Sequence, residues 1–162
     1  LRQIIIKYVL IASAKLRKYN QLSSAITIFT NTNIHSKDFY KSEATGKINV
    51  PTSDSRIILK TSLDLTRKIF RPYKRLTKAG VILHKLQSNR YEQKQLLDQQ
   101  SIEKELSQQR LNYVIDEINN RNGRDTINWG SSIIEKEWSP RREKLSRIKT
   151  TNIENIPTIY AN

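Results

Sequence analysis

The chain has 162 residues, enough for one domain with an appendage, and only 36% of them are hydrophobic. It contains no cysteine, which excludes disulfides, thiol chemistry and zinc sites of the cysteine type. No apolar run reaches the ~18 residues that a membrane span needs, and nothing resembles a signal peptide, so we expect a cytoplasmic location.

The net charge of +14 is unevenly distributed. Residues 1–88 hold 17 Lys and Arg against 4 Asp and Glu, whereas residues 89–162 hold 12 against 11. A polyanion such as nucleic acid is the partner that this distribution favours, because each phosphate that a cation neutralises releases a counterion. The alternative is a basic domain that binds nothing specific.

The first three predicted elements differ in their hydrophobic period. Residues 1–19 place apolar side chains at helical spacing, which predicts an amphipathic helix. Residues 22–30 are rich in β-branched types and predict a strand. Residues 43–51 alternate between apolar and polar positions, which predicts a second strand with one wet face that ends at Pro51.

A second helix and a third strand follow. Residues 52–55, Thr-Ser-Asp-Ser, supply N-cap candidates for a helix that runs to about Phe70 and stops at Arg71-Pro72. Residues 75–87 predict the third strand. The order helix, strand, strand, helix, strand is that of a ferredoxin-like βαββαβ unit without its first strand. We therefore predict an α+β fold, in which two helices cover one face of a sheet of three to four strands.

The C-terminal part changes in composition. From Gln87 the chain is polar and rich in Gln, and residues 106–119 recover helical spacing before Asn122-Gly123 ends the helix. Residues 125–132 predict a short strand, and the end of the chain predicts a polar, loosely ordered tail. We expect this part to be mainly helical or irregular.

Two blocks of the sequence resemble a known family. The segments KLRKYN, AITIFTNTN, YKSEATGKINVPTSDSR and IFRPYKRLTKAGVIL resemble, in this order, the little-finger domain of the UmuC family of Y-family translesion DNA polymerases. The segment LNYVIDEINNRNGRDTI resembles the start of that family's C-terminal domain of unknown function. Its continuation has the family's order and spacing at Trp138, Leu145, Ser146, Thr150, Thr151 and Pro157.

The resemblance implies three regions. Residues 1–88 would be a DNA-binding little finger, residues 89–105 a linker and residues 106–162 the C-terminal domain. The first little-finger strand and the polymerase's palm, fingers and thumb would lie upstream of Leu1. The implied role is in DNA repair and the SOS response, in association with the nucleoid.

By the same resemblance, the open face of the sheet lies along the DNA backbone. Alternation along the third strand turns Ala79, Val81 and Leu83 toward the helices and Lys78 outward. Cations there would contact phosphates, which position a duplex without reading its sequence. The predicted DNA-binding residues are Lys41, Lys47, Arg71, Lys74, Arg75 and Lys78. Alternatively, these cations only solubilise an exposed sheet.

Protein partners are also implied. Gln93, Leu96 and Leu97 are similar to the sliding-clamp binding peptide of bacterial polymerases, which combines a polar contact with two apolar anchors. An ordinary helix face is the alternative for this pattern. The UmuD′ dimer and the RecA filament are further partners in the family.

The acidic residues predict no catalytic site. A nucleotidyl transferase needs several acids that converge on Mg²⁺, and Asp116 and Glu117 point in different directions on a helix. His35 and His84 lack metal-ligand spacing and are interpreted as ordinary surface or loop residues. We expect no catalytic residue, cofactor or small-molecule substrate in this chain, although the parent family uses Mg²⁺ for DNA synthesis.

The function predicted from these observations is DNA and partner binding by the C-terminal part of a translesion polymerase. Three alternatives stay open. The chain could belong to a complete error-prone polymerase, be an inactive remnant of a split gene, or be an RNA-binding ferredoxin-like module.

Overall fold

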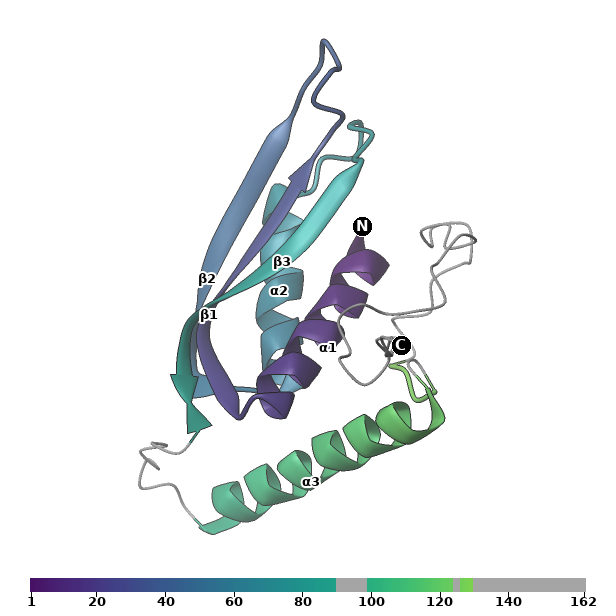
Figure 1. The fold of residues 1–162 in the computed structure, drawn as a ribbon. Helices are drawn as coiled ribbons and strands as arrows, with labels where there is room; N and C mark the ends of the chain where they lie inside the picture. The colour runs from purple at the N-terminus through teal and green to yellow at the C-terminus, as the bar shows by residue number, and fades with distance from the viewer. Residues whose placement is uncertain (90–98, 124–125, 130–162) are drawn as a thin grey trace, which may run out of the picture.

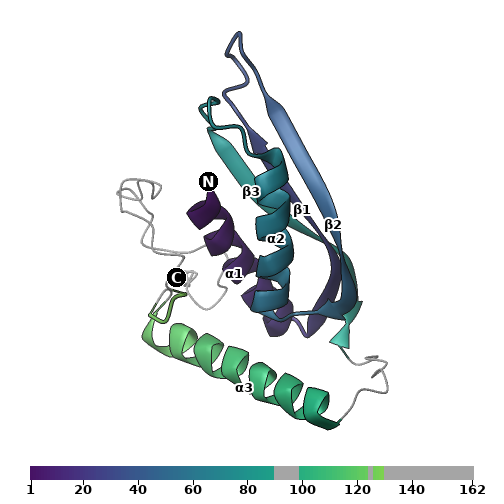
Figure 2. The ribbon, with the colours of Figure 1, turned by 180° about the vertical axis from the view of Figure 1, so that it is seen from behind.

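Three long strands and two helices form a two-layered unit, and a third helix lies across one end of it (Figures 1 and 2). The computed structural model describes residues 1–89, 99–123 and 126–129. The strands are β1 (Gln21–Asn31), β2 (Lys41–Thr52) and β3 (Lys78–Ser88). The helices are α1 (Arg2–Lys18), α2 (Ser55–Ile69) and α3 (Gln99–Asn122). The predicted α+β class and order of elements are confirmed.

The sheet is antiparallel, with the strand order β2–β1–β3. Residues that lie opposite one another share a face, so Ile26 lies with Gly46 and Leu83 on the face that α1 and α2 cover. Because β3 pairs directly with β1, the sheet has no gap in its middle. A further strand could join only at the outer edge of β2 or of β3.

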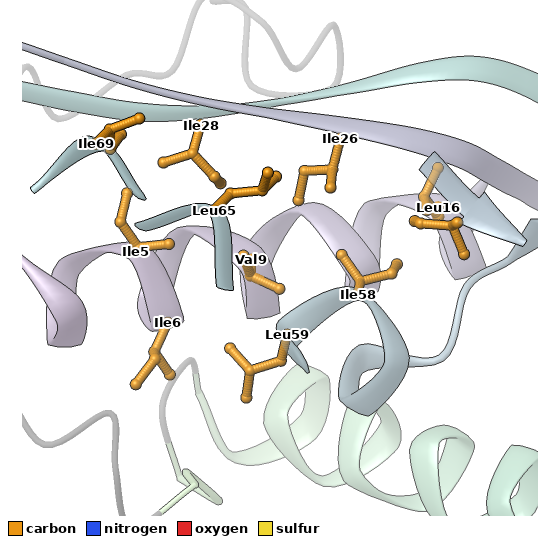
Figure 3. Packing of buried hydrophobic residues seen from close by; sticks show 11 residues of the cluster. Ile5, Ile6, Val9, Leu16, Ile26, Ile28, Ile58, Leu59, Leu65 and Ile69 are labelled. Atoms are coloured by element: carbon orange, nitrogen blue, oxygen red, sulfur yellow. The ribbon is translucent and has the colours of Figure 1, made fainter. Parts of the chain in front are cut away.

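The core lies between the central strand and the two helices, where side chains from α1, β1 and α2 converge (Figure 3). Its best buried members have at most 1% of their surface exposed and are Val9 and five isoleucines, namely Ile5, Ile6, Ile26, Ile28 and Ile58. The amphipathic pattern of the sequence predicts this arrangement, because α1 and α2 each turn one apolar stripe toward the sheet. The outer strands contribute smaller shares, through Ile48, Ala44, Ala79, Val81 and Leu83.

The end of β2 differs from the prediction. Pro51 does not end the strand, which continues to Thr52, and Val50 is 47% exposed instead of facing the core. The register with β1 shifts between Ser23 and Ala25, so residues 48–51 of β2 lie opposite a single residue of β1. Proline is tolerated in such an irregular stretch because no regular ladder there needs its missing N–H group.

The helix α2 begins with a capped end. Asp54 is the N-cap residue and accepts a hydrogen bond from the backbone N–H of Arg56 at 2.8 Å. Partial burial alone raises the pKa of Asp54, but its hydrogen bonds with Arg56, the charge of Arg56 and a hydrogen bond with Asn112 outweigh burial and hold the pKa below the usual value.

The helix α3 contacts this end of the unit through polar side chains. Arg17, in the last turn of α1, binds both carboxylate oxygens of Asp116 at 2.5 and 2.8 Å. The same guanidinium donates to the carbonyl oxygen of Ser53 at 2.8 Å and to the hydroxyl of Ser55 at 2.9 Å. Asn112 is 6% exposed beside Asp54. One arginine therefore joins α1, the start of α2 and α3.

Two features of the C-terminal part bear on its predicted organisation, and only the second differs from the prediction. The helix α3 begins at Gln99, so it takes in the last part of the predicted 89–105 linker. Residues 126–129, the described part of the predicted strand 125–132, form a bend. Here the side chain of Asn119 bonds the backbone N–H of Ile127 at 2.8 Å and its carbonyl at 3.1 Å, groups that a strand would have used in pairing. Among the described residues, no helix has the length and apolar character needed to cross a bilayer.

Candidate nucleic-acid interface

In the part of the chain that the structure describes, α1 and α2 both lie on one face of the sheet, and no helix covers the other face (Figures 1 and 2). Along this open face the register brings side chains of the three strands into rows. In the order β2, β1, β3 the rows are Lys41, Asn31, Lys78; then Glu43, Phe29, Gly80; then Thr45, Thr27, Ile82; and then Lys47, Ala25, His84. The predicted outward orientation of Lys78 is confirmed.

Two of the six predicted DNA-binding residues, Lys41 and Lys78, lie in the row at one end of this face, and three more lie on the segment that leads into β3. Lys41 and Lys78 are both exposed and flank Asn31, whose Oδ1 is buried without a hydrogen-bond partner in the described part of the chain. The segment that joins α2 to β3 reaches the sheet at the same row, where the backbone N–H of Thr77 donates to the carbonyl of Asn31 at 2.9 Å. This segment carries Arg71, Lys74 and Arg75, all exposed.

Lys47 lies apart from these five cations. It is exposed on the same face, but its row is nearer the other end of the sheet, where it lies across Ala25 from His84. Three of the six cations, Lys41, Lys47 and Lys78, therefore lie on the open face, and the other three lie on the segment between α2 and β3, beside the row of Lys41 and Lys78. We call these six residues the basic face.

Positive charge is not confined to the basic face. The helices carry cations too, but three of their arginines are paired with acids: Arg17 with Asp116, Arg56 with Asp54 and Arg67 with Asp64. Within the described residues, the only ion pair of the basic face joins Lys41 to Glu43 at 3.6 Å, and both side chains are about 60% exposed. Exposed lysines also lie on α1 and α2, away from the open face of the sheet. Examples are Lys15, Lys60 and Lys68.

Two features of the open face were missed from the sequence. The ring of Phe29 covers Gly80, since a Cβ on Gly80 would lie 2.3 Å from Phe29 Cζ. His84, interpreted as an ordinary surface residue, bonds Thr27 through Nε2. The alternation Lys78, Gly80, Ile82, His84 could have placed the histidine on this face, but its partner depends on the pairing of β1 with β3.

The acidic residues and the predicted clamp-binding residues are the remaining positions that the sequence analysis considered. Among the residues that the structure describes, no group of three or more His, Cys, Asp and Glu could hold a metal ion. Asp116 and Glu117 do point differently, since Asp116 turns to Arg17 whereas Glu117 is exposed. The predicted clamp-binding residues Gln93, Leu96 and Leu97 lie outside the described residues.

Comparison with protein-family models matches residues 1–96 to the impB/mucB/samB family C-terminal domain. The chain belongs to this family. The match spans α1 to β3 and so contains the whole sheet and the whole basic face. A second model, a domain of unknown function (DUF4113), matches residues 109–159. The ion pair of Arg17 with Asp116 thus joins the two matched regions.

Curated relatives agree with this membership. Protein UmuC of Salmonella typhimurium is 28% identical over 96% of this chain and 37% of its own length. Protein ImpB of the same organism is 28% identical over 97% of this chain, and protein MucB of Escherichia coli is 34% identical over 90% of it. The chain spans little more than a third of the length of these relatives, 37% of ImpB and 34% of MucB. The resemblance predicted from the sequence is confirmed. A search of solved structures found no significant match.

Proposed function

We propose that this chain is the DNA-gripping and partner-binding C-terminal part of a translesion DNA polymerase of the UmuC type. The observation that carries the proposal is the basic face: no helix of the described residues covers the sheet surface that carries Lys41, Lys47 and Lys78, and three more exposed cations lie on the segment that leads into β3. Membership of the impB/mucB/samB family supports it, because a C-terminal domain match covers every residue of that face.

The basic face suits a phosphate backbone better than it suits base edges. Lysine and arginine contacts to phosphates fix the register and orientation of a duplex and carry no sequence information. In the row next to that of Lys78, the ring of Phe29 packs over Gly80 of the neighbouring strand, so these two residues are packed against each other. A grip of this kind is indifferent to a damaged base, which is what synthesis past a lesion requires.

Catalysis belongs to other parts of such a polymerase. In this proposal, DNA synthesis with Mg²⁺ takes place outside this chain, and no residue here has a catalytic role. Gln93, Leu96 and Leu97 would bind the sliding clamp, and residues 106–162 would contact the UmuD′ dimer or the RecA filament. These contacts place the protein in the cytoplasm, at the nucleoid, during the SOS response.

The experiment compares two triple variants in DNA binding. The first replaces Lys41, Lys47 and Lys78 with Gln, and the matched control replaces Lys15, Lys60 and Lys68 on the helices. Fluorescence anisotropy with a labelled primer–template duplex gives Kd at salt concentrations from about 50 to 200 mM. We expect the wild-type affinity to fall steeply with salt, with a log–log slope of about −0.9 for each phosphate contacted.

The sheet variant should bind at least about tenfold more weakly and lose about two to three units of slope, whereas the helix variant should stay close to wild type. An affinity that does not respond to salt, or equal losses in the two variants, would contradict the proposal. Single-stranded RNA as a competitor tests the RNA-binding alternative in the same assay, since only an RNA-binding module should prefer it to the duplex.

A further inference from the structure

Three hydrogen-bonded side chains, those of Thr45, Thr27 and His84, lie diagonally across two neighbouring rows of the open face. Thr45 of β2 and Thr27 of β1 lie opposite each other, with 2.7 Å between their Oγ1 atoms. Thr27 Oγ1 is also 2.8 Å from Nε2 of His84 on β3. Thr27 is only 8% exposed, whereas His84 is exposed. The imidazole is thus tethered to the sheet at one nitrogen and open to solvent.

The tether leaves the second ring nitrogen available. In the part of the chain that the structure describes, no hydrogen bond engages Nδ1 of His84. A threonine hydroxyl both donates and accepts, so Thr27 can donate to the neutral ring or accept from the protonated ring. Thr45, Thr27 and His84 therefore keep their hydrogen bonds in both states, and protonation of His84 costs none of them.

The charges around His84 are positive. Lys47 of β2 occupies the same row across Ala25, and Lys85 is the next residue of β3. From β1, His84 meets Ala25 and Thr27, neither of which is charged. Glu43 lies on the same face beyond Thr45, but it pairs with Lys41. The helices α1 and α2 lie behind the sheet. The row of His84 contains no acid that could neutralise the positive charge of a protonated ring. An anion from outside the protein would therefore be attracted to this position.

We propose that His84 is a phosphate-contacting residue of the DNA-binding face, in the row of Lys47. Its Nδ1–H donates to a phosphate oxygen, while Thr27 holds Nε2 and fixes the plane of the ring. The contact is strongest when the ring is protonated, because a charge-assisted hydrogen bond to phosphate then replaces a neutral one. This inference rests on the proposed DNA-binding function and adds to it a residue and a dependence on pH.

The first experiment measures DNA affinity at pH 8.0 and at pH 5.5 for wild type, His84→Gln and His35→Gln. His35 is the matched control, since it is an exposed histidine in the loop between β1 and β2. As the pH falls from 8.0 to 5.5, the DNA affinity of wild type and of His35→Gln should rise by a factor about tenfold larger than that of His84→Gln. This is the difference expected when bound DNA raises the pKa of one histidine by about one unit.

The outcomes separate the two proposals. If no variant shows salt-dependent binding, the DNA-binding function itself is wrong. If all three bind DNA and gain equally as the pH falls, DNA binding stands and the role of His84 is overturned.

A second measurement does not depend on a folded variant. NMR resonances of the wild-type His84 ring should titrate at a higher pH in the DNA complex than in the free protein, whereas those of His35 should not move. In Thr27→Val, which removes the tether, the shift of His84 should shrink. Identical titration of His84 with and without saturating DNA would overturn the inference.

Discussion

At the scale of single residues, the open face depends on a glycine that leaves room for a ring. Phe29 Cζ and Cε1 lie 2.3 and 2.5 Å from where a Cβ on Gly80 would be, closer than any real contact permits. Covering a strand glycine with a cross-strand aromatic ring compensates for the packing that glycine cannot supply. Phe29 and Gly80 are therefore one packing unit.

This unit gives a prediction about stability. Gly80→Ala should lower the free energy of unfolding by about 1–3 kcal/mol, because the new methyl group must push the ring of Phe29 aside. Urea denaturation measures the change. In Phe29→Ala/Gly80→Ala the clash is gone, so the double variant should lose less than the sum of the two single losses. Strict additivity would show that the ring and the glycine are independent.

At the scale of elements, the docking of α3 is the unusual feature, because the helix turns polar residues toward the rest of the protein. Arg17 and Asp116 are only 18% and 21% exposed, whereas Leu111 and Tyr113 of α3 are 51% and 68% exposed. A fork-to-fork arginine–carboxylate pair is geometrically specific. It can hold a helix in one orientation without an apolar contact.

We expect Arg17→Ala to lower the free energy of unfolding by about 1–3 kcal/mol, since it leaves the Asp116 carboxylate and the Ser53 carbonyl without their donor. Arg67→Ala is the matched control, because it breaks the ion pair with Asp64, whose side chains are 77% and 56% exposed. That change should stay below ~0.5 kcal/mol. Both values come from urea denaturation. Equal losses in the two variants would mean that the ion pair of Arg17 contributes no more to stability than an exposed surface ion pair does.

The difference between apolar and polar packing also explains which element bounds could be predicted from the sequence. The bounds of α1, β1, α2 and β3 follow the sequence closely because their apolar periods are imposed by one core. The start of α3 does not, because the helical spacing of apolar residues begins only near residue 106, and the contacts of that helix run through the polar residues Asn112 and Asp116. The continuation of β2 through Pro51 depends on a register shift in its neighbour, which no local pattern records.

At the scale of the whole molecule, the proposed DNA-binding surface and α3 are separate. Lys41, Lys47 and Lys78 of the basic face lie on the side of the sheet away from α1 and α2, whereas α3 contacts the end of the helical layer near Arg17 and Asp54 (Figure 2). All six cations of the basic face lie within residues 1–89, and so does the core. Residues 89–162 add a net charge of only +1.

Residues 1–89 alone should therefore bind DNA with the same dependence on salt as the whole chain. Fluorescence anisotropy of the two proteins, measured side by side, checks the slope of log Kd against log salt, which we expect to agree within about half a unit. A slope that is smaller by one unit or more in the shorter protein would show that the C-terminal part also contacts phosphates.

The candidate interface was only partly predictable from the sequence, because part of it depends on which strands pair. Alternation along β2 and β3 is local, so the exposure of Lys41, Lys47 and Lys78 could be derived from the sequence. The bond between Thr27 and His84 joins residues 57 positions apart, and it exists only because β3 pairs with β1 and not with β2. A polar side chain among apolar neighbours gives no sign of such a partner.

The central position of β1 also bears on how the chain folds. Its pairing with β2 closes across one loop, where the backbone N–H of Thr32 meets the carbonyl of Tyr40 at 2.9 Å. Its pairing with β3 brings together Thr77 and Asn31, which are 46 positions apart, and a longer closure costs more chain entropy before any contact repays it. The hairpin of β1 and β2 can thus form early, while the arrival of β3 completes the surface that carries the proposed function. The pairing of β3 with β1 is therefore expected both to limit the rate of folding and to complete the proposed DNA-binding surface.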